Sequence, residues 1–278
     1  MKDYLNHSFN RDDENFISII DELPLWSAPF GLDLLSCIRM KRNMKVLDIG
    51  CGTGFPLIEI AMRLGSSSKI YGLDPWIPIT RRIKQKIETL NLKNVTIVTG
   101  FAEKMPFDDR HFDMVVSNNG LNNVQDIEQS IIECSRVMKS GSQFIMTFNL
   151  ENTMMEFYDV FRMILEKYGM ADEIKKLIAH IYSKRKPLEK IIDLLKTAGL
   201  GIENVQHKSF RIDFLDGSTM FDHYLIKYWF LDEWKNILSM QDREKIFEET
   251  EEHLNNSALN NGSFFLTIPY VIINCIKP

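Results

Sequence analysis

The sequence is poor in cysteine and lacks any long hydrophobic run. Its 278 residues include 4 cysteines, and none of them forms a C-x-x-C pair. This spacing indicates neither a zinc site nor a disulfide framework, so we expect no bound metal. No stretch reaches the roughly 20 apolar residues that a membrane span needs, and the N-terminus has no signal-peptide core. We therefore expect a cytoplasmic protein without membrane contact.

An excess of positive charge is missing as well. The formal net charge is −5, and the basic cluster Lys-Arg-Lys at residues 184–186 directly precedes Pro187. We predict that this cluster is a solvated loop, because a run of like charges is most often solvated. Without a basic surface nothing attracts the chain toward phosphate backbones, so we expect no nucleic-acid partner.

From Lys45 onward, short β-branched runs typical of strands alternate with amphipathic segments typical of helices. Proline at positions 56 and 187 suits helix starts, and glycine at positions 65 and 199 suits helix ends. This alternation predicts an α/β fold, a parallel sheet with helices on both of its faces. The expected strands cover residues 45–50, 69–74, 94–100, 111–118, 142–150, 202–214 and 263–278, and the expected helices cover 55–65, 75–90, 126–141 and 186–200.

Two segments, 151–186 and 216–256, depart from this alternation and are helical in composition. Each follows a predicted strand, where open α/β sheets bind their ligands, so we interpret both as a cap over the site. The predicted organisation is an N-terminal helical cap segment (1–44), a cofactor-binding core (45–150), a helical insertion (151–186), a core helix and strand (187–215), a helical cap insertion (216–256) and a final core strand (257–278).

Three glycines on alternate positions, 50, 52 and 54, follow the first strand and precede a helix. They allow a tight turn and a close approach of a ligand to the backbone. The dinucleotide fingerprint would require glycine at position 55, where this chain has Phe55. Asp48 would also repel a pyrophosphate, although it suits a ligand that carries an ammonium and a sulfonium. An NAD-dependent oxidoreductase is therefore the less favoured alternative.

Asp74 ends the second predicted strand, twenty residues after Gly54. Its two oxygens can accept both hydroxyls of a ribose. The dipeptide Asp74-Pro75 is equally typical of a helix cap followed by proline in the first turn. Together with Asp48 and the glycines, it favours a ribose that carries no pyrophosphate.

Four stretches resemble successive motifs of class I S-adenosylmethionine-dependent methyltransferases, closest to the small-molecule branch of ubiquinone and menaquinone biosynthesis. They cover residues 46–54, 72–76, 100–126 and 134–148. The resemblance implies a doubly wound, seven-stranded, mostly parallel Rossmann-like sheet with an antiparallel last strand and helical cap insertions. It also implies S-adenosylmethionine as cofactor and S-adenosylhomocysteine as product.

The resemblance further implies which residues contact the cofactor. One departure is Phe101, because the family often has an acidic residue there to accept the adenine amino group. The implied cofactor-binding residues are Asp48, Gly50, Cys51, Gly52, Gly54, Asp74, Pro75, Trp76, Phe101, Ala102, Glu103, Ser117, Asn118 and Asn119.

The acceptor side is less defined by the sequence. Methyl transfer from a sulfonium needs little acid or base help, so no catalytic residue is assigned. We predict that His223 faces solvent on a helix, opposite an apolar stripe. The run "SNNGLNN" lacks the Asn-Pro-Pro-Tyr clamp of many methyltransferases that act on nucleobases. We expect a small, partly apolar acceptor, with Trp26, Asn122, Asn123, Tyr228 and Trp229 as candidate contacts, although ordinary packing explains each of them equally well.

A second alternative retains the entire motif set. A noncatalytic module that binds S-adenosylmethionine and regulates a partner would have the same motifs and no turnover. An exposed apolar patch on the cap would favour that alternative. The sequence does not indicate an oligomeric state.

Overall fold

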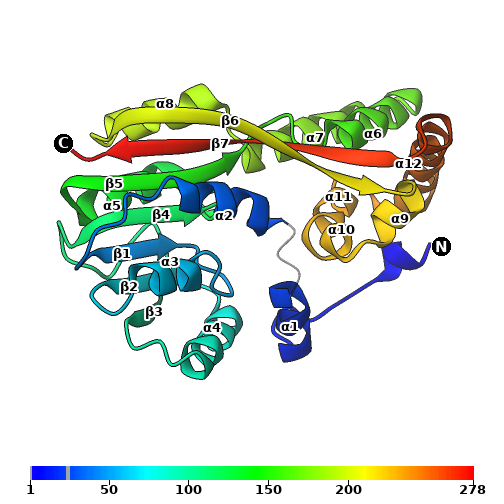
Figure 1. Cartoon of the computed structure of the whole chain (residues 1–278). Coiled ribbons are helices and arrows are strands. Elements are labelled where there is room, and N and C mark those ends of the chain that lie inside the picture. The colour runs from blue at the N-terminus through cyan, green and yellow to red at the C-terminus, as the bar shows by residue number, and fades with distance from the viewer. Residues whose placement is uncertain (1, 23–25) are drawn as a thin grey trace. The chain divides into compact units, whose positions relative to one another are not determined.

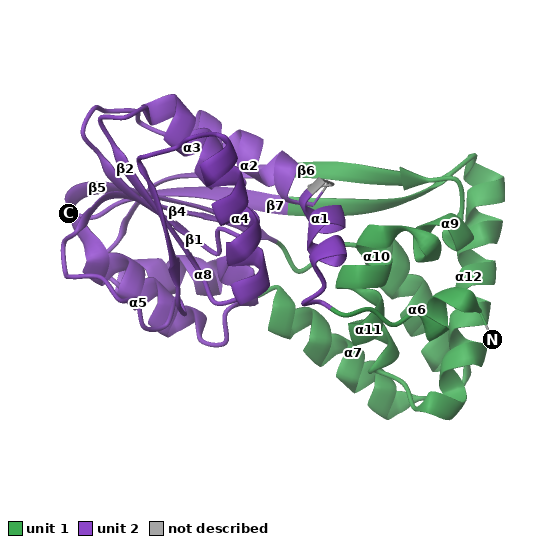
Figure 2. Ribbon diagram, turned by 90° about the horizontal axis from the view of Figure 1, so that it is seen from below, with its two compact units in different colours: residues 1–10, 150–186, 209–269 green, residues 11–149, 187–208, 270–278 purple. Residues whose placement is uncertain are grey.

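The computed structural model describes residues 2–22 and 26–278. The chain forms two compact units (Figures 1 and 2). Unit 1 comprises residues 1–10, 150–186 and 209–269, and unit 2 comprises residues 11–149, 187–208 and 270–278. The chain therefore passes between the units several times, and each unit is assembled from segments that are distant in sequence.

A seven-stranded sheet has the order β3-β2-β1-β4-β5-β7-β6. Strands β1 to β5 run parallel to one another, and β7 pairs antiparallel with β5. The predicted mostly parallel sheet with an antiparallel last strand is confirmed. The strands are β1 (Lys45–Ile49), β2 (Lys69–Asp74), β3 (Val95–Thr99), β4 (Phe112–Asn118), β5 (Met138–Asn149), β6 (Gly201–Phe214) and β7 (Phe264–Ile276).

Helices cover both faces of the sheet in unit 2. Figure 2 shows α3 and α4 on one face and α5 and α8 on the other, which is the doubly wound arrangement. Apolar residues at helical spacing explain the packing: in α3, Leu57, Ile58 and Ala61 are buried. The helices of this unit are α1 (Glu14–Glu22), α2 (Ser27–Ser36), α3 (Leu57–Leu64), α4 (Ile77–Thr89), α5 (Ile127–Val137) and α8 (Leu188–Thr197), with the 3-10 helix η2 (Leu121–Asn123).

Unit 1 is mainly helical and has an aromatic core. The rings of Phe157 and Trp234 stack with centroids 3.9 Å apart, and Phe221 packs edge-on against Phe157. Both segments that we interpreted as departures from the alternation are helical. The helices are η1 (Asp3–Asn6), α6 (Met155–Lys167), α7 (Ala171–Lys184), α9 (Gly217–Asp222), α10 (Tyr224–Trp229), α11 (Leu231–Lys235) and α12 (Met240–Asn261).

The predicted solvent-facing helical position of His223 is wrong. Its backbone is extended (ψ 133°), so it separates α9 from α10. The side chain is half-buried, and its Nδ1 accepts a hydrogen bond of 3.3 Å from the Leu225 amide. The imidazole thus caps the next helix, and this local hydrogen bond outweighs the helical periodicity of the sequence.

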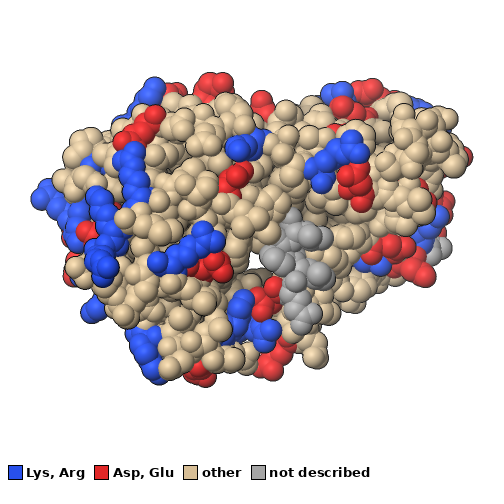
Figure 3. Space-filling model, viewed as in Figure 1, with Lys and Arg blue, Asp and Glu red and all other residues tan. Residues whose placement is uncertain are grey.

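The predicted solvated loop at residues 184–186 is wrong for its central residue. Lys184 is the last residue of α7, and Arg185 is only 2% exposed. On the face seen in Figure 3, acidic and basic side chains are interspersed. In the part of the chain that is described, no helix combines the length and the apolar character of a membrane span, and no three acidic, histidine or cysteine side chains group as metal ligands.

Candidate functional site

The glycine-rich loop connects β1 to α3 in a conformation that only glycine adopts easily. Gly50 has φ +70°, and a Cβ there would lie 2.9 Å from the Cα of Gly120. Gly52 has φ +54°, yet a Cβ there would have no atom within 4 Å. The backbone at Gly50 is therefore closely packed, whereas the space beside Gly52 is open to a ligand.

Asp48, next to the end of β1, is a fully buried carboxylate with 0% exposure. Neither of its oxygens has a hydrogen-bond partner among the described residues. Burial, and then the charge of Asp74, raise the pKa of Asp48 well above its ordinary value. The Leu57 amide lowers this pKa in part, although it does not reach hydrogen-bond geometry. A cationic or hydrogen-bond-donating ligand would stabilise the charged form of this carboxylate.

Asp74, the last residue of β2, links the strand to the glycine loop. One carboxylate oxygen accepts the Gly52 amide at 3.0 Å, and the other accepts the Trp76 amide at 2.9 Å. Burial raises the pKa of Asp74, and these two amides partly offset the rise. Helix α4 begins at Ile77 with Trp76 as its N-cap, so the bond to the Trp76 amide belongs to the turn before the helix, and the Asp74 helix cap weighed from the sequence is not formed. Each oxygen keeps a further lone pair, so a second pair of donors can bind there.

Helix α1 is fixed against α4 by a buried ion pair that the sequence did not reveal. Asp21 accepts from Arg82 Nε at 2.7 Å and from Lys86 Nζ at 2.6 Å. Burial raises the pKa of Asp21, but these two cations hold it below its ordinary value. Lys86 also donates to the carbonyl of Thr53 in the glycine loop at 2.8 Å. The N-terminal helix thus supports the loop through a single lysine.

At the end of β4, two of the predicted residues have structural bonds. Ser117 donates to the carbonyl of Ile49 and accepts the Leu121 amide, both at 3.2 Å. Asn118 donates to the carbonyl of Ser27 at 3.0 Å, which fixes the start of α2 beside this strand end. These bonds position the backbone of the site.

The next asparagines present unpaired oxygens. Asn119 has φ +58°, and its buried Oδ1 has no partner among the described residues. Asn122 donates through Nδ2 to Oδ1 of Asn149, and its own Oδ1 is also buried without a described partner. Asn123 donates to the backbone carbonyl of Asn119 at 3.4 Å. Asn149 was missed because only its place at the end of a strand marks it.

Two further predicted cofactor residues, Cys51 and Glu103, contact other parts of unit 2. Burial raises the pKa of the Cys51 thiol, and a Cβ on Gly72 would lie 2.8 Å from its sulfur. Glu103 accepts the amides of Gln125 at 2.8 Å and Asp126 at 3.2 Å, so it anchors the loop before α5. Three other predicted cofactor residues differ in exposure: Phe101 is 59% exposed, Pro75 is exposed, and Ala102 is buried.

Aromatic candidates for the acceptor fall into both units. In unit 2, Trp26 packs edge-on against Phe30, with ring centroids 5.6 Å apart. Trp76, which is a predicted cofactor contact, donates through Nε1 to Asp12 at 3.2 Å. In unit 1, Tyr228 packs against Phe9 at 4.8 Å, and Trp229 is 38% exposed. Trp26 therefore belongs to the same unit as the glycine loop, the asparagines and Asp74, whereas Tyr228 and Trp229 lie in unit 1.

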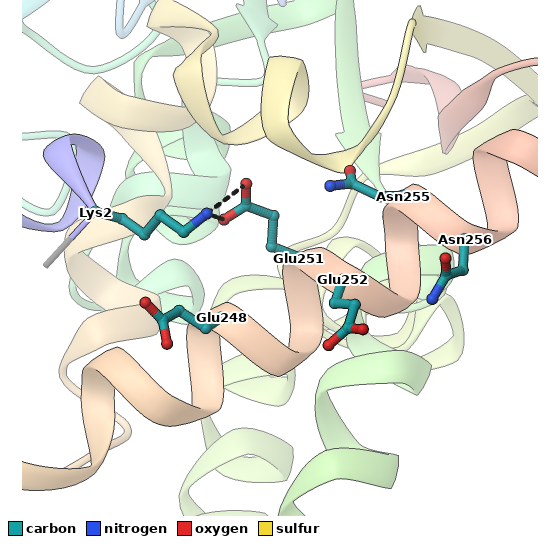
Figure 4. Close-up of a pocket in the computed structure, with 6 residues that line it drawn as sticks. All are labelled: Lys2, Glu248, Glu251, Glu252, Asn255 and Asn256. Atoms are coloured by element: carbon teal, nitrogen blue, oxygen red, sulfur yellow. Dashed lines mark hydrogen bonds and ion pairs between the residues drawn. The ribbon is translucent and has the colours of Figure 1, made fainter.

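A pocket of about 310 Å³ on α12 in unit 1 serves as an anchor for the N-terminus (Figure 4). Glu251 accepts from Lys2 Nζ at 3.4 Å and from the Tyr4 hydroxyl at 2.8 Å. Ser218 donates to the same carboxylate at 2.5 Å. Because Glu251 accepts from both Lys2 and Tyr4, the pocket holds η1 against α12.

The residues present fit S-adenosylmethionine. Six buried side-chain polar atoms lack a partner among the described residues, and four of them are oxygens of Asp48, Asn119 and Asn122. Asp48 is the penultimate residue of β1, Asn119 directly follows the neighbouring strand β4, and Asn122 lies in η2, three residues further on. Buried polar atoms normally have partners, so this concentration marks a place where a ligand supplies donors.

The comparison with known families identifies the chain. A family model described as a methyltransferase domain matches residues 40–251. With its seven-stranded topology, the chain belongs to this family of class I S-adenosylmethionine-dependent methyltransferases. The resemblance inferred from the motifs is therefore confirmed.

Relatives and solved structures agree with this assignment. Demethylmenaquinone methyltransferase from Bacillus mycoides (strain KBAB4) is 32% identical over 192 residues, 64% of this chain and 78% of that relative. The YcgJ protein from Bacillus subtilis has a TM-score of 0.60 at 17% identity, covering 90% of this chain and 98% of that one. Geranyl diphosphate C-methyltransferase from Streptomyces coelicolor A3(2), solved with S-adenosyl-L-homocysteine, has a TM-score of 0.55 at 16% identity, covering 100% and 90%. The two structures show the shared fold.

Proposed function

We propose that this methyltransferase transfers the methyl group to a small, partly apolar acceptor by direct displacement. The observation that carries the proposal is the set of buried, unpaired oxygens on Asp48, Asn119 and Asn122. A ligand with an ammonium and several hydroxyls satisfies such acceptors, whereas a pyrophosphate would bring further negative charge. When bound, S-adenosylmethionine supplies a methyl group already activated on a sulfonium.

Each donor-side residue has a distinct task in this proposal. The carboxylate of Asp48 faces the ammonium, and the remaining lone pairs of Asp74 accept the ribose hydroxyls. The open backbone at Gly52 permits the close approach. Trp76 and Phe101 flank the adenine, and Ala102 closes its edge. None of these tasks requires proton transfer, so alignment and the exclusion of water supply most of the acceleration.

On the acceptor side, the unpaired oxygen of Asn122 orients a donor group of the acceptor, while Asn119 flanks the methyl group of the cofactor. Asn149 fixes the orientation of Asn122 through the bond between their side chains. Trp26 offers an apolar surface in the same unit. The name of the Bacillus mycoides relative makes demethylmenaquinone, a molecule with an apolar body, the first acceptor to test.

Calorimetric titration tests the donor assignment directly. We expect the purified chain to bind S-adenosylmethionine and S-adenosylhomocysteine and not NADH, because the loop lacks the fingerprint that accommodates a pyrophosphate. Formation of S-adenosylhomocysteine is then measured with demethylmenaquinone and, for comparison, with double-stranded DNA. Binding of NADH alone would overturn the donor assignment, and turnover with DNA alone would overturn the acceptor class.

Replacing Asp74 by alanine tests the ribose assignment. We expect S-adenosylmethionine to bind more weakly by about 1–3 kcal/mol, the scale for hydrogen bonds to a charged acceptor. Asp126→Ala is the matched control, because it removes an exposed carboxylate that only caps α5. That control is expected to lower stability by about 1 kcal/mol without changing affinity. Equal affinities for Asp74→Ala and the unmodified chain, with the fold intact by circular dichroism, would refute the role of Asp74.

A further inference from the structure

Arg185 is a buried arginine at the C-terminal end of α7, in unit 1. Its side chain is 2% exposed, and its backbone amide donates to the carbonyl of Ile181 at 3.0 Å. The guanidinium lies over the ring of Tyr158, with Cζ 5.6 Å from the ring centroid. Arginine is rarely buried without a partner, so its surroundings indicate what this charge is for.

Arg185 uses almost none of its donors within the described chain. Its one side-chain hydrogen bond runs from Nη1 to the Tyr158 hydroxyl at 3.4 Å, and its buried Nε has no partner. Among the described residues, no acidic side chain forms an ion pair with Arg185. The nearby carboxylate of Glu233 pairs with Lys184 instead, at 2.7 Å. The edge formed by Nε and Nη2, which is suited to bidentate binding, therefore remains unused.

The groups around Arg185 do not compensate its charge. Tyr158 also accepts from Trp234 Nε1 at 3.0 Å, and its hydroxyl lies 3.3 Å from Nε2 of His180. Burial, opposed by the charge of Glu233 and assisted by that of Arg185, lowers the pKa of His180 to about 4, so the imidazole is neutral at neutral pH. The Tyr158 oxygen thus serves as a neutral junction for two donors. The C-terminus of α7 and the Tyr158 ring favour a cation there, but neither is an anion.

Exclusion of water strengthens the interaction between Arg185 and any anion that binds beside it. A guanidinium that has lost its hydration interacts strongly with a carboxylate or phosphate, because the surroundings screen the charges poorly. Lys184 pairs with Glu233 at 2.7 Å, and Lys186 lies over the ring of Tyr182 with Nζ 4.8 Å from the centroid, so both of these neighbours have other partners within the chain. Aromatic side chains of α6 and α11, among them Trp234, form an apolar wall beside it.

We propose that Arg185 is the anchor of an anion-binding site in unit 1, which takes the carboxylate or phosphate group of a small molecule through the Nε and Nη2 edge. The Tyr158 hydroxyl holds Nη1 and thereby sets the plane of the guanidinium. This site is independent of the methyl-donor residues, all of which lie in unit 2. It assigns a binding role to Arg185, which the methyl-transfer chemistry does not use.

Titration of the full chain with inorganic phosphate and with benzoate, at constant ionic strength and without S-adenosylmethionine, tests this proposal. We expect saturable binding of at least one of the two probes, and the preferred probe tells phosphate from carboxylate. Arg185→Met is expected to weaken that binding at least tenfold, whereas the control Lys186→Met, from the same cluster, leaves it within twofold. The Met variant is also expected to be at least as stable as the unmodified chain, because it removes an uncompensated buried charge.

Arg185→Lys provides a second variant in case the methionine variant does not fold. It keeps the charge and loses the planar fork, so we expect at least tenfold weaker probe binding with an unchanged fold. The proposal is overturned if the unmodified chain binds neither probe saturably, or if the Arg185 variants bind as well as Lys186→Met. Because S-adenosylmethionine is absent from this titration, its outcome does not depend on the proposed methyl transfer.

Discussion

Asp48→Asn is expected to weaken the binding of S-adenosylmethionine at least 100-fold while the ligand-free chain becomes more stable. Asparagine has nearly the same shape, so the fold persists, but the variant has no charge to face the ammonium. Removing one partner of a buried ion pair costs about 3–5 kcal/mol. In the ligand-free chain, by contrast, the carboxylate is buried with 0% exposure and no described partner, so its loss is favourable.

The gain in stability should depend on pH in a defined direction. The pKa of Asp48 is raised above its ordinary value of 3.8, so the folded chain binds more protons than the unfolded chain between the two pKa values. Stability contributed by this group is therefore present below about pH 4 and is lost as the pH rises through the folded-state pKa. We expect Asp48→Asn to match the unmodified chain at pH 4 and to exceed it by about 1–3 kcal/mol at pH 7.

Calorimetric titration and urea unfolding at both pH values measure these two effects. Asp193→Asn is the matched control, because Asp193 is an exposed carboxylate on α8. Surface changes of this kind usually alter stability by less than about 0.5 kcal/mol, and affinity should not change. If Asp48→Asn bound S-adenosylmethionine normally, or if it were less stable at pH 7, the assignment of Asp48 to the ammonium would be wrong.

Gly120→Ala is expected to damage both the fold and the cofactor site. The residue has φ −70° and ψ −43°, which any amino acid adopts, so backbone strain is not the cause. A Cβ there would instead overlap the carbonyl oxygen of Ile49 and lie 3.0 Å from Oγ of Ser117. Both neighbours are fixed in the sheet, so the methyl group must push the ends of β1 and β4 apart. We expect a loss of about 3 kcal/mol, the upper end for overpacking.

The same displacement should abolish cofactor binding, because Asp48 and Asn119 lie at these two strand ends. Thermal unfolding followed by circular dichroism should show a melting temperature lower by roughly 6–12 °C, and titration should show no detectable S-adenosylmethionine affinity. Gly201→Ala is the control, since a Cβ at Gly201 would meet its nearest atom, the carbonyl oxygen of Ile276, at an ordinary 3.5 Å. Equal behaviour of the two alanine variants would show that the contact with Ile49 is not limiting.

The Arg185 site and the residues around Asp48 were found by the same criterion, the presence of buried polar atoms without a hydrogen-bond partner. Both contain buried polar atoms that the described chain leaves unpaired. At the Asp48 site these atoms are acceptors, and at Arg185 the atom is a donor, so the expected ligands have opposite character. Binding partners of opposite charge can therefore be measured separately, in unit 2 and in unit 1.

The sequence by itself determined the fold class, the cofactor and the glycine loop. Each depends on local physical rules: apolar spacing distinguishes strands from helices, and the positive φ angles at Gly50 and Gly52 require glycine. Asp48 before the loop and Phe55 after it made a dinucleotide the less favoured ligand. These properties belong to short stretches of chain, so a sequence pattern is sufficient to predict them.

Only the tertiary structure decided which of these polar groups are paired. Asn122 meets Asn149, and Asp21 meets Lys86, across long separations in sequence. Arg185 reads as a solvated charge in its own tripeptide, and it is buried because α6 and α11 pack over it through Tyr158 and Trp234. Burial and pairing depend on residues brought together by folding, so they cannot be predicted from local propensity.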